Sequence, residues 1–319
     1  MAESPETLPI TRIFFDANQK LRSGWRFFLF FSLFMVASFL VGGFLSAIFG
    51  LLPVGFSSNS LIARVGGSIV GLILALGIGW VCAKVFEGLP FRSLGASFTK
   101  GWIKDFGLGI LFGSLSIGLA VLIAAAFGGL RFSFNGEAGS SALLLTLAVT
   151  FVIFLFGAAF EEALMRGYML QTFMRSNLTP LGLILTSFLF ASGHLGNNAA
   201  ALFSTANTVL AGVWLAVGYL RTRTLWFATG LHLAWNWVQG SFFGIEVSGF
   251  ADFATAPLFK EIDNGPAIVS GGDYGIEGGV ACTIALAVSA AAIWFLPFLK
   301  ANAEMTALTS APKEERKEA

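Results

Sequence analysis

The residues best suited to chemistry are a few polar side chains inside long apolar segments. Ionisable groups are unfavourable in the hydrocarbon of a membrane, so those that occur there usually have a function. Glu161 and Glu162 are adjacent in one such segment, and both histidines of the chain, His194 and His232, lie in two others. A Glu and a His can together orient and deprotonate a water molecule. The set therefore indicates a site that activates water.

Helical spacing separates the two adjacent carboxylates. Glu162 and Arg166 stand at positions i and i+4, so they share one face of a helix and can form an ion pair. Glu161 is rotated by about 100° from Glu162 and points elsewhere. We therefore expect Arg166 to hold Glu162, while Glu161 stays free to act as a general base. The alternative is that this segment is the cytoplasmic end of a helix, where its charges are solvated.

The second histidine has a polar partner on its own helix face. His232 and Asn236 also stand at positions i and i+4, and they could donate hydrogen bonds to a developing oxyanion. An activated water, with such donors to stabilise the oxyanion, would hydrolyse an acyl bond, most naturally a peptide bond. A lone buried histidine is more often a structural group with satisfied hydrogen bonds, and this alternative stays open for each histidine taken alone.

Positions along the chain allow these groups to share one depth in the membrane. Asn and Pro residues predict a turn between two helices at 175–180. Glu161 lies 14 residues before this turn and His194 lies 14 residues after it, about 21 Å in each case. His232 and Asn236 lie about 14 and 20 Å from the start of their helix. The convergence requires the helix of Glu161 to continue unbroken to about residue 175.

The composition predicts an all-α, polytopic membrane protein with a bundle of eight transmembrane helices. Of the 319 residues, 56% are hydrophobic and 12% are charged, whereas soluble domains have about 25% charged residues. Several apolar runs approach or exceed the roughly 18–20 residues that cross a bilayer. The eight predicted spans are 27–52, 65–85, 106–130, 141–175, 180–196, 199–220, 225–245 and 279–299.

The positive charges predict the side of the membrane that each loop faces. Cytoplasmic loops are enriched in Lys and Arg. With eight spans and a cytoplasmic N-terminus, 16 of the 19 Lys and Arg residues fall on or close to the cytoplasmic side, and Arg64, Arg131 and Lys260 fall outside. We therefore expect both termini in the cytoplasm, a bacterial plasma membrane as the location, and an irregular, acidic extracytoplasmic loop at 246–278.

The chain is expected to have three parts. They are a cytoplasmic segment (1–24), a membrane domain (25–300) with its catalytic core at about 141–245, and a charged tail (301–319) that is disordered beyond Thr309.

Two glycine pairs predict close contacts between helices. Gly67 with Gly71, and Gly109 with Gly113, form GxxxG patterns that let helix backbones approach each other.

Three short motifs occur in order: Glu161-Glu162-x-x-x-Arg166, Phe190-x-x-x-His194 and His232-x-x-x-Asn236. Together, over about 143–239, they resemble the motifs of the CPBP (Abi) intramembrane peptidases, a family related to the type II CAAX prenyl endopeptidases. The resemblance implies that Glu161 is the catalytic base and that His194 helps it to activate water. It implies that His232 and Asn236 form the oxyanion site. It further implies supporting roles for Glu162, Arg166 and Phe190.

The predicted function is therefore an intramembrane endopeptidase that acts on peptide or protein substrates, including membrane-anchored ones. No cofactor is expected, because no HExxH pattern is present; if zinc binds, its ligands would be Glu161, His194 and His232. Two other classes remain open. One is a proton- or ion-coupled transporter that uses the same buried groups, and the other is a non-catalytic immunity or scaffold protein with the same fold. No nucleic-acid partner is expected, since no basic recognition motif is present.

Overall fold

Long apolar helices dominate the fold. The computed structural model describes residues 11–50 and 61–311. Within these residues, five stretches of helix are long and apolar enough to cross a membrane. They are α2 (Ser23–Gly50), α3 (Leu61–Glu87), α4 (Trp102–Phe127), the continuous stretch of α5 (Ser140–Glu162), η3 (Ala163–Met169) and α6 (Leu170–Met174), and α8 (Leu202–Thr222). The chain is therefore an integral, multi-pass membrane protein.

Three further helices coincide with predicted spans but are shorter. α7 (Thr179–Ser192) and α11 (Val280–Phe295) are apolar helices of 14 and 16 residues. α9 (Leu225–Trp237) has 13 residues and continues as the π-helical segment η4 (Val238–Phe242). A helix needs about 20 residues to cross the hydrocarbon. Length and apolar character therefore support five of the eight predicted spans, counted over the described residues.

The helix that carries Glu161 continues as predicted. α5, η3 and α6 form one helical stretch of 35 residues that ends at Met174. A turn at 175–178 then leads into α7, and Asn177 in this turn has a left-handed backbone conformation with φ 56°. The condition for a shared depth of the polar groups, an unbroken helix past Glu161, is thus confirmed.

Glycines set the distance between α4 and α9. A Cβ atom at Gly109 would lie 2.3 Å from the carbonyl oxygen of Phe227. A Cβ atom at Gly113 would lie 2.3 Å from the carbonyl oxygen of Leu231. Neither distance is compatible with a side chain, so the close approach predicted at this glycine pair is confirmed. It places α9 directly against α4.

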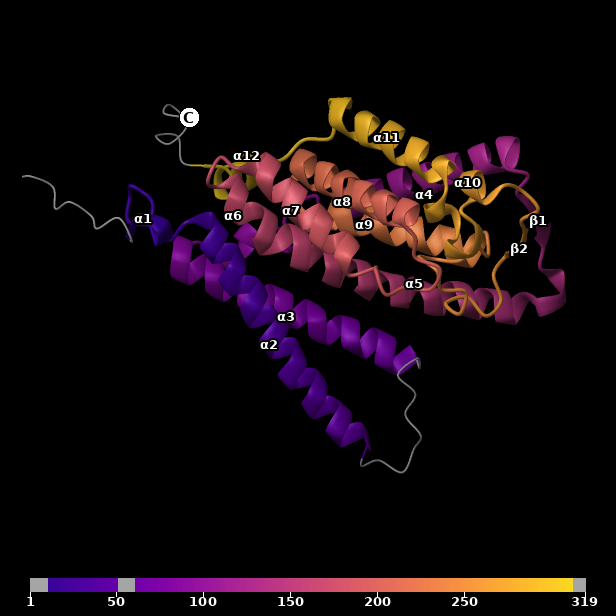
Figure 1. The fold of residues 1–319 in the computed structure, drawn as a ribbon, viewed down its shortest axis with the longest axis horizontal. Coiled ribbons are helices and arrows are strands. Elements are labelled where there is room, and N and C mark those ends of the chain that lie inside the picture. The colour runs from indigo at the N-terminus through magenta and orange to yellow at the C-terminus, as the bar shows by residue number, and fades with distance from the viewer. Residues whose placement is uncertain (1–10, 51–60, 312–319) are drawn as a thin grey trace, which may run out of the picture.

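The two ends of the molecule carry different elements. Figure 1 shows α1 (Thr11–Phe14), α6 and α12 (Ala303–Thr309) at one end, and β1 (Arg131–Phe134), β2 (Phe259–Ile262) and α10 (Ala267–Ser270) at the other. β1 and β2 form an antiparallel sheet with Phe132 opposite Glu261. The all-α prediction missed this sheet because four-residue strands are too short to show a clear alternation of polar and apolar residues.

Single helical turns make up much of the remaining structure. They are η1 (Phe91–Leu94), η2 (Gly136–Ala138), η5 (Gly272–Tyr274) and η6 (Ile276–Gly278). Two of them, together with β2 and α10, lie in the loop 246–278, which is otherwise irregular as predicted.

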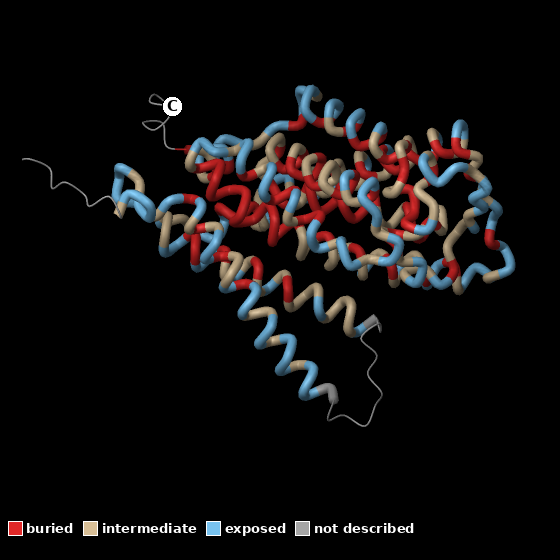
Figure 2. The backbone as a smooth tube through the Cα atoms, viewed as in Figure 1, coloured by how far each residue is buried: buried red, intermediate tan, exposed pale blue. Residues whose placement is uncertain are grey.

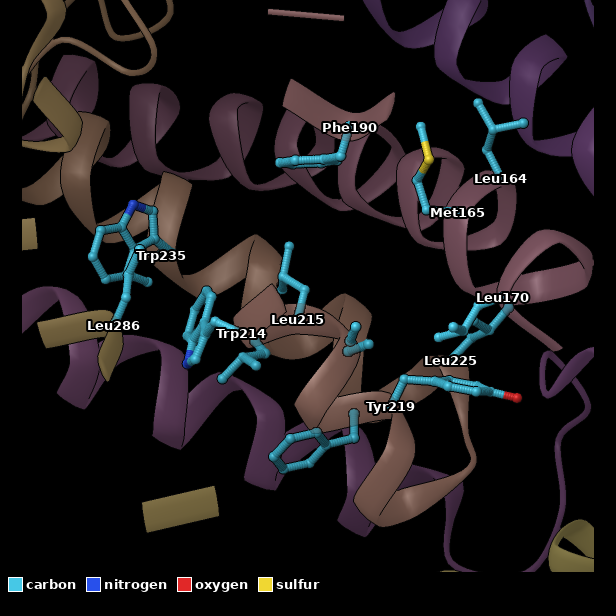
Figure 3. Close-up of a cluster of buried hydrophobic side chains, with 14 of the residues drawn as sticks. Leu164, Met165, Leu170, Phe190, Trp214, Leu215, Tyr219, Leu225, Trp235 and Leu286 are labelled. Carbon is cyan, nitrogen blue, oxygen red and sulfur yellow. The ribbon is translucent and has the colours of Figure 1, made fainter. Parts of the chain in front are cut away.

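The buried core surrounds α8 and α9. Figure 2 shows that the buried backbone is concentrated in this part of the molecule, while the far halves of α2 and α3 are mostly exposed or intermediate. Figure 3 shows Trp214 of α8 near Trp235 of α9 and Leu286 of α11. The rings of Trp214 and Trp235 have centroids 5.4 Å apart. Trp214 Nε1 also donates a hydrogen bond to Ser289 Oγ at 2.8 Å, which ties α8 to α11.

The first part of the C-terminal tail is helical. Asn302 caps α12, because its side-chain oxygen accepts a hydrogen bond from the backbone N–H of Met305 at 2.7 Å. Arg92 and Glu304 form an ion pair at 2.6 Å that connects α12 to η1. The disorder expected beyond Thr309 concerns mainly 312–319, which lie outside the described residues.

Candidate active site

All four predicted catalytic side chains line one cavity. Glu161 on α5, His194 in the loop after α7, and His232 and Asn236 on α9 border a cavity of about 510 Å³. The remaining lining is mostly apolar and aromatic, and it comes from several helices and from the loop 246–278. The convergence predicted from positions along the chain is therefore present in the fold.

A buried charged cluster lies behind His232, which lines this cavity. The side chains of Glu162 and Arg166 are both 0% exposed, and Arg166 Nη1 donates to Glu162 Oε1 at 3.0 Å. Arg166 Nη2 donates to the carbonyl oxygen of Gly212 on α8 at 2.7 Å. His232 Nδ1 lies 3.0 Å from the same oxygen of Glu162. The predicted ion pair is confirmed, and the structure adds His232 as a third member.

The contacts of the two histidines indicate which ring nitrogen carries hydrogen. His194 Nδ1 lies 2.8 Å from the carbonyl oxygen of Phe190. A carbonyl oxygen can only accept, so Nδ1 is the donor. His232 Nδ1 likewise faces a carboxylate oxygen of Glu162. In the neutral form of each ring, Nε2 therefore holds the lone pair and can accept a proton.

Glu161 contacts the other nitrogen of the His232 ring. Its Oε2 lies 3.7 Å from His232 Nε2, and its side chain is 32% exposed. The imidazole thus stands between the two carboxylates, with Glu162 at Nδ1 and Glu161 at Nε2. This corrects the expectation that Glu162 is committed to Arg166 alone, and it places Glu161 beside the proposed oxyanion histidine. The reason is that α5 and α9 pack against each other, which a single helix pattern does not reveal.

Phe190, for which a supporting role is predicted, packs among the polar residues of the site. The centroid of its ring lies 4.8 Å from that of His194 and 5.8 Å from that of His232. The Arg166 guanidinium lies 5.2 Å from the same ring, within the range of a cation–π interaction. One aromatic side chain therefore packs against both histidines and the buried arginine.

Glycine on α3 makes room for the residue that precedes Glu161. A Cβ atom at Gly71 would lie 2.7 Å from the ring of Phe160. A Cβ atom at Gly67 would meet nothing within 4 Å among the described residues. The close approach predicted for this glycine pair therefore holds at Gly71 and is wrong at Gly67.

Both helices that carry site residues change to π-helical geometry next to them. η3 begins directly after Glu162, and η4 begins two residues after Asn236. π-helical turns are rare and occur often at functional sites. No sequence pattern predicts them, because they arise from packing around the helix rather than from local preference.

The acidic loop 246–278, to which the sequence assigned no role, forms another side of the cavity. Glu277 Oε1 accepts a hydrogen bond from Trp235 Nε1 at 3.1 Å. Glu277 Oε2 accepts from the backbone N–H of Ser248 at 2.6 Å and from its hydroxyl at 2.9 Å. Trp235 directly precedes Asn236, so these bonds tie the loop to the helix that carries the oxyanion residues.

The same loop also contacts the segment of His194 and helix α3. Asn197 Nδ2 donates to the carbonyl oxygen of Ser248 at 3.0 Å. Arg64 pairs with Asp252, and its guanidinium lies 4.6 Å from the Phe253 ring centroid. Sequence reasoning missed these residues, since partners this far apart in the chain leave no local signal.

The alternative of a zinc site can be tested against the side-chain arrangement. Glu161, His194 and His232 would have to surround one point at about 2 Å each. Over residues 11–50 and 61–311, no group of three or more His, Cys, Asp or Glu side chains has an arrangement that could hold a metal ion. As placed, these three residues do not fit a three-ligand zinc site.

Comparison with protein families identifies the central part of the chain. Residues 142–238 match the family described as "Type II CAAX prenyl endopeptidase Rce1-like". No curated protein and no solved structure matches the chain. The matched segment runs from α5 to the start of η4, so it contains all four of the predicted catalytic residues. This chain therefore carries, at residues 142–238, an Rce1-like domain of the type II CAAX prenyl endopeptidase (CPBP/Abi) family.

Proposed function

We propose that this chain is an intramembrane endopeptidase that hydrolyses a peptide bond in a peptide or protein substrate. The observation that carries the proposal is the single cavity lined by Glu161, His194, His232 and Asn236. The family match of residues 142–238 supports it, because that family is described by an endopeptidase activity.

Glu161 is the proposed general base. Its partly exposed carboxylate borders the cavity, where water can reach it. His194 offers its Nε2 lone pair, since its Nδ1 is bonded to the Phe190 carbonyl oxygen. The two side chains would orient one water molecule, and Glu161 would take its proton as the water attacks the carbonyl carbon of the substrate.

His232 and Asn236 are the proposed oxyanion donors. They lie one helical turn apart on α9, so their side chains point to the same side. His232 donates through Nε2 when its ring is doubly protonated, and the carboxylates of Glu162 and Glu161 then lie at its two nitrogens to balance the charge. Glu162 and Arg166 would act as positioning residues that hold this ring.

The apolar lining of the cavity favours a substrate segment with apolar side chains next to the scissile bond, as in a membrane-anchored peptide or protein. We further propose a bacterial plasma-membrane protein with eight spans and a catalytic core at about 141–245. Both termini would face the cytoplasm, because α1 and α12 lie at one end of the molecule, whereas β1 and β2, with Arg131 and Lys260, lie at the other.

The test is cleavage of a mixed library of membrane-anchored peptides by the purified chain in liposomes, with products detected by mass spectrometry. Glu161→Gln should lower the rate by about 10²- to 10⁴-fold and leave the thermal unfolding temperature unchanged. Glu137→Gln is the matched control, because Glu137 is exposed, pairs with Lys260 and does not line the cavity. Full activity of Glu161→Gln would reject the mechanism, and an inactive parent would favour a non-catalytic role.

We also propose that catalysis needs no metal ion, in line with the side-chain arrangement. Metal analysis of the active protein should then find no stoichiometric zinc, and chelation should leave the cleavage rate unchanged. One tightly held zinc per chain, lost together with activity on chelation, would overturn this part of the proposal.

A further inference from the structure

A second cavity lies at the end of the molecule that carries α1 and α12 (Figure 1). Its volume is about 1020 Å³, and none of its lining residues borders the catalytic cavity. Its wall is built from α1 and the segment after it, the start of α2, the end of α3, the turn between α6 and α7, and α12. In the proposed topology, this is the end of the helices nearest the cytoplasm.

Two arginines at this cavity share a single carboxylate. Arg26 Nη1 donates to Glu87 Oε1 at 2.5 Å. Arg175 Nε and Nη2 donate to the two oxygens of Glu87, both at 2.8 Å. The side chains of Arg26 and Glu87 are each only 6% exposed, and that of Arg175 is 8% exposed. Two positive charges thus face one negative charge in a nearly buried cluster, and a buried charge without a counter-charge is unfavourable. An anion in the cavity would balance it.

The polar groups around this cluster also favour a negatively charged ligand. Arg26 Nε is buried and has no hydrogen-bond partner among the described residues. Arg22 Nε donates to two backbone carbonyl oxygens at 2.8 and 3.2 Å, which holds its guanidinium in place at the cavity. Lys20 adds another cation, and Asp16 adds the second carboxylate of the lining. Among the described residues, four cationic side chains and two carboxylates therefore line the cavity.

Apolar side chains continue from the charged part of the cavity. Phe28 lies near the start of α2, and Leu178 and Leu181 lie at the start of α7. They are 55%, 43% and 45% exposed. α2 is long and apolar enough to cross a membrane, and α7 is a shorter apolar helix. The cavity thus combines an excess of positive charge with an apolar surface, and the proposed topology places it at the depth of the lipid headgroups.

We propose that this cavity binds one anionic phospholipid molecule. Its phosphate would lie near Lys20, Arg22 and Arg26, and its acyl chains would extend along Phe28 and Leu181. An inorganic anion would balance the charge but leave the apolar surface uncovered. A zwitterionic lipid would bring its own cation to an already cationic site. The proposal does not depend on peptidase activity, so its test needs none.

The test is lipid retention by the full-length protein in detergent, followed by native mass spectrometry with added phosphatidylglycerol, phosphatidylcholine or inorganic phosphate. The parent should retain one phosphatidylglycerol in preference to phosphatidylcholine. A basic residue near a membrane surface contributes about 1 kcal/mol of attraction to anionic lipid. The double variant Lys20→Ala/Arg22→Ala should therefore bind phosphatidylglycerol about 30-fold more weakly.

Two further variants separate charge from fold. Lys100→Ala removes an exposed cation that lines a different cavity, and it should bind like the parent. Arg22→Lys keeps the charge and should retain most of the binding, even if loss of the Arg22 hydrogen bonds loosens the segment around α1. Equal retention of the two lipids, unchanged binding in the double variant, or competition by inorganic phosphate at the affinity of the lipid would each overturn the proposal.

Discussion

Glu161 and Glu162 are neighbours in the chain, yet their carboxylates have different surroundings. Glu162 is fully buried between Arg166 and His232, at 3.0 Å from each. Glu161 is partly exposed and borders the cavity. Adjacent residues lie about 100° apart around the axis of a helix, so the two carboxylates point to different sides. One carboxylate is therefore suited to holding the site together and the other to proton transfer.

This difference predicts that two matched substitutions differ in their effect on stability. Glu162→Gln keeps the shape of the side chain but removes the charge that compensates Arg166, and loss of one partner from a buried pair destabilises a protein by about 3–5 kcal/mol. We expect a lower thermal unfolding temperature and reduced cleavage, because His232 loses the carboxylate that orients it. Glu161→Gln should reduce cleavage alone. Parental thermal stability of Glu162→Gln would contradict the role of this cluster.

At the scale of single residues, the sequence predicted contacts between side chains that lie one turn apart on the same helix. The pairing of Glu162 with Arg166 follows from the i, i+4 spacing and is present at 3.0 Å. The contact of Glu162 with His232 joins residues 70 positions apart. Likewise, Glu277 gave no local sign of its bonds to Trp235 and Ser248. Contacts across helices depend on how the helices pack, which is why the role of the acidic loop could not be predicted.

Among the elements, α9 is the one whose position matters most for the site. It carries His232 and Asn236, and it lies against α4 at two positions where a Cβ atom would come within 2.3 Å of its backbone. The sequence identified these glycines by their spacing. It did not show that their partner is the helix of the second histidine, nor that η3 and η4 would be π-helical.

A pair of glycine substitutions on α4 tests this close approach. Gly113→Ala would place Cβ 2.3 Å from the Leu231 carbonyl oxygen, so α9 must move. Overpacking of this kind destabilises by about 1–3 kcal/mol, and displacement of His232 should lower cleavage as well. Gly118→Ala is the control on the same helix, since its Cβ would meet nothing within 4 Å among the described residues. It should be neutral or stabilising by up to about 1 kcal/mol. Equal stability and activity in the two variants would show that α4 does not position α9.

At the scale of the whole molecule, the apolar runs predicted a multi-pass helical protein. The distribution of basic residues predicted that both chain termini lie on one side of the membrane. Helix lengths were less predictable. The runs near 180–196 and 279–299 end earlier in the structure, at Ser192 and Phe295, where the chain leaves the helix for a loop. The sheet of β1 and β2 joins two loops about 130 residues apart, and only the fold brings them together.

One residue of that sheet, Glu261, makes the stability of the whole molecule depend on pH. Burial, together with the negative charges of Glu246 and Asp263, raises the pKa of Glu261 from its ordinary value of 4.5 to about 8. Between pH 4.5 and about 8, the folded protein therefore keeps a proton on Glu261 that the unfolded chain releases. Stability should be highest below pH 4.5 as far as this group is concerned, and it should fall as the pH rises to about 8.

Thermal unfolding in detergent between pH 5 and pH 9 measures this effect. The parent should lose unfolding temperature as the pH rises, and Glu261→Gln should flatten the curve because its amide stays neutral. Glu137→Gln is again the control. The ion pair with Lys260 lowers the pKa of Glu137. Any contribution of Glu137 to the stability of the fold therefore changes only below pH 4.5. A curve for Glu261→Gln with the same slope as the parent would show that another group controls stability in this range, and that ionisation of Glu261 does not strain the pairing of β1 with β2.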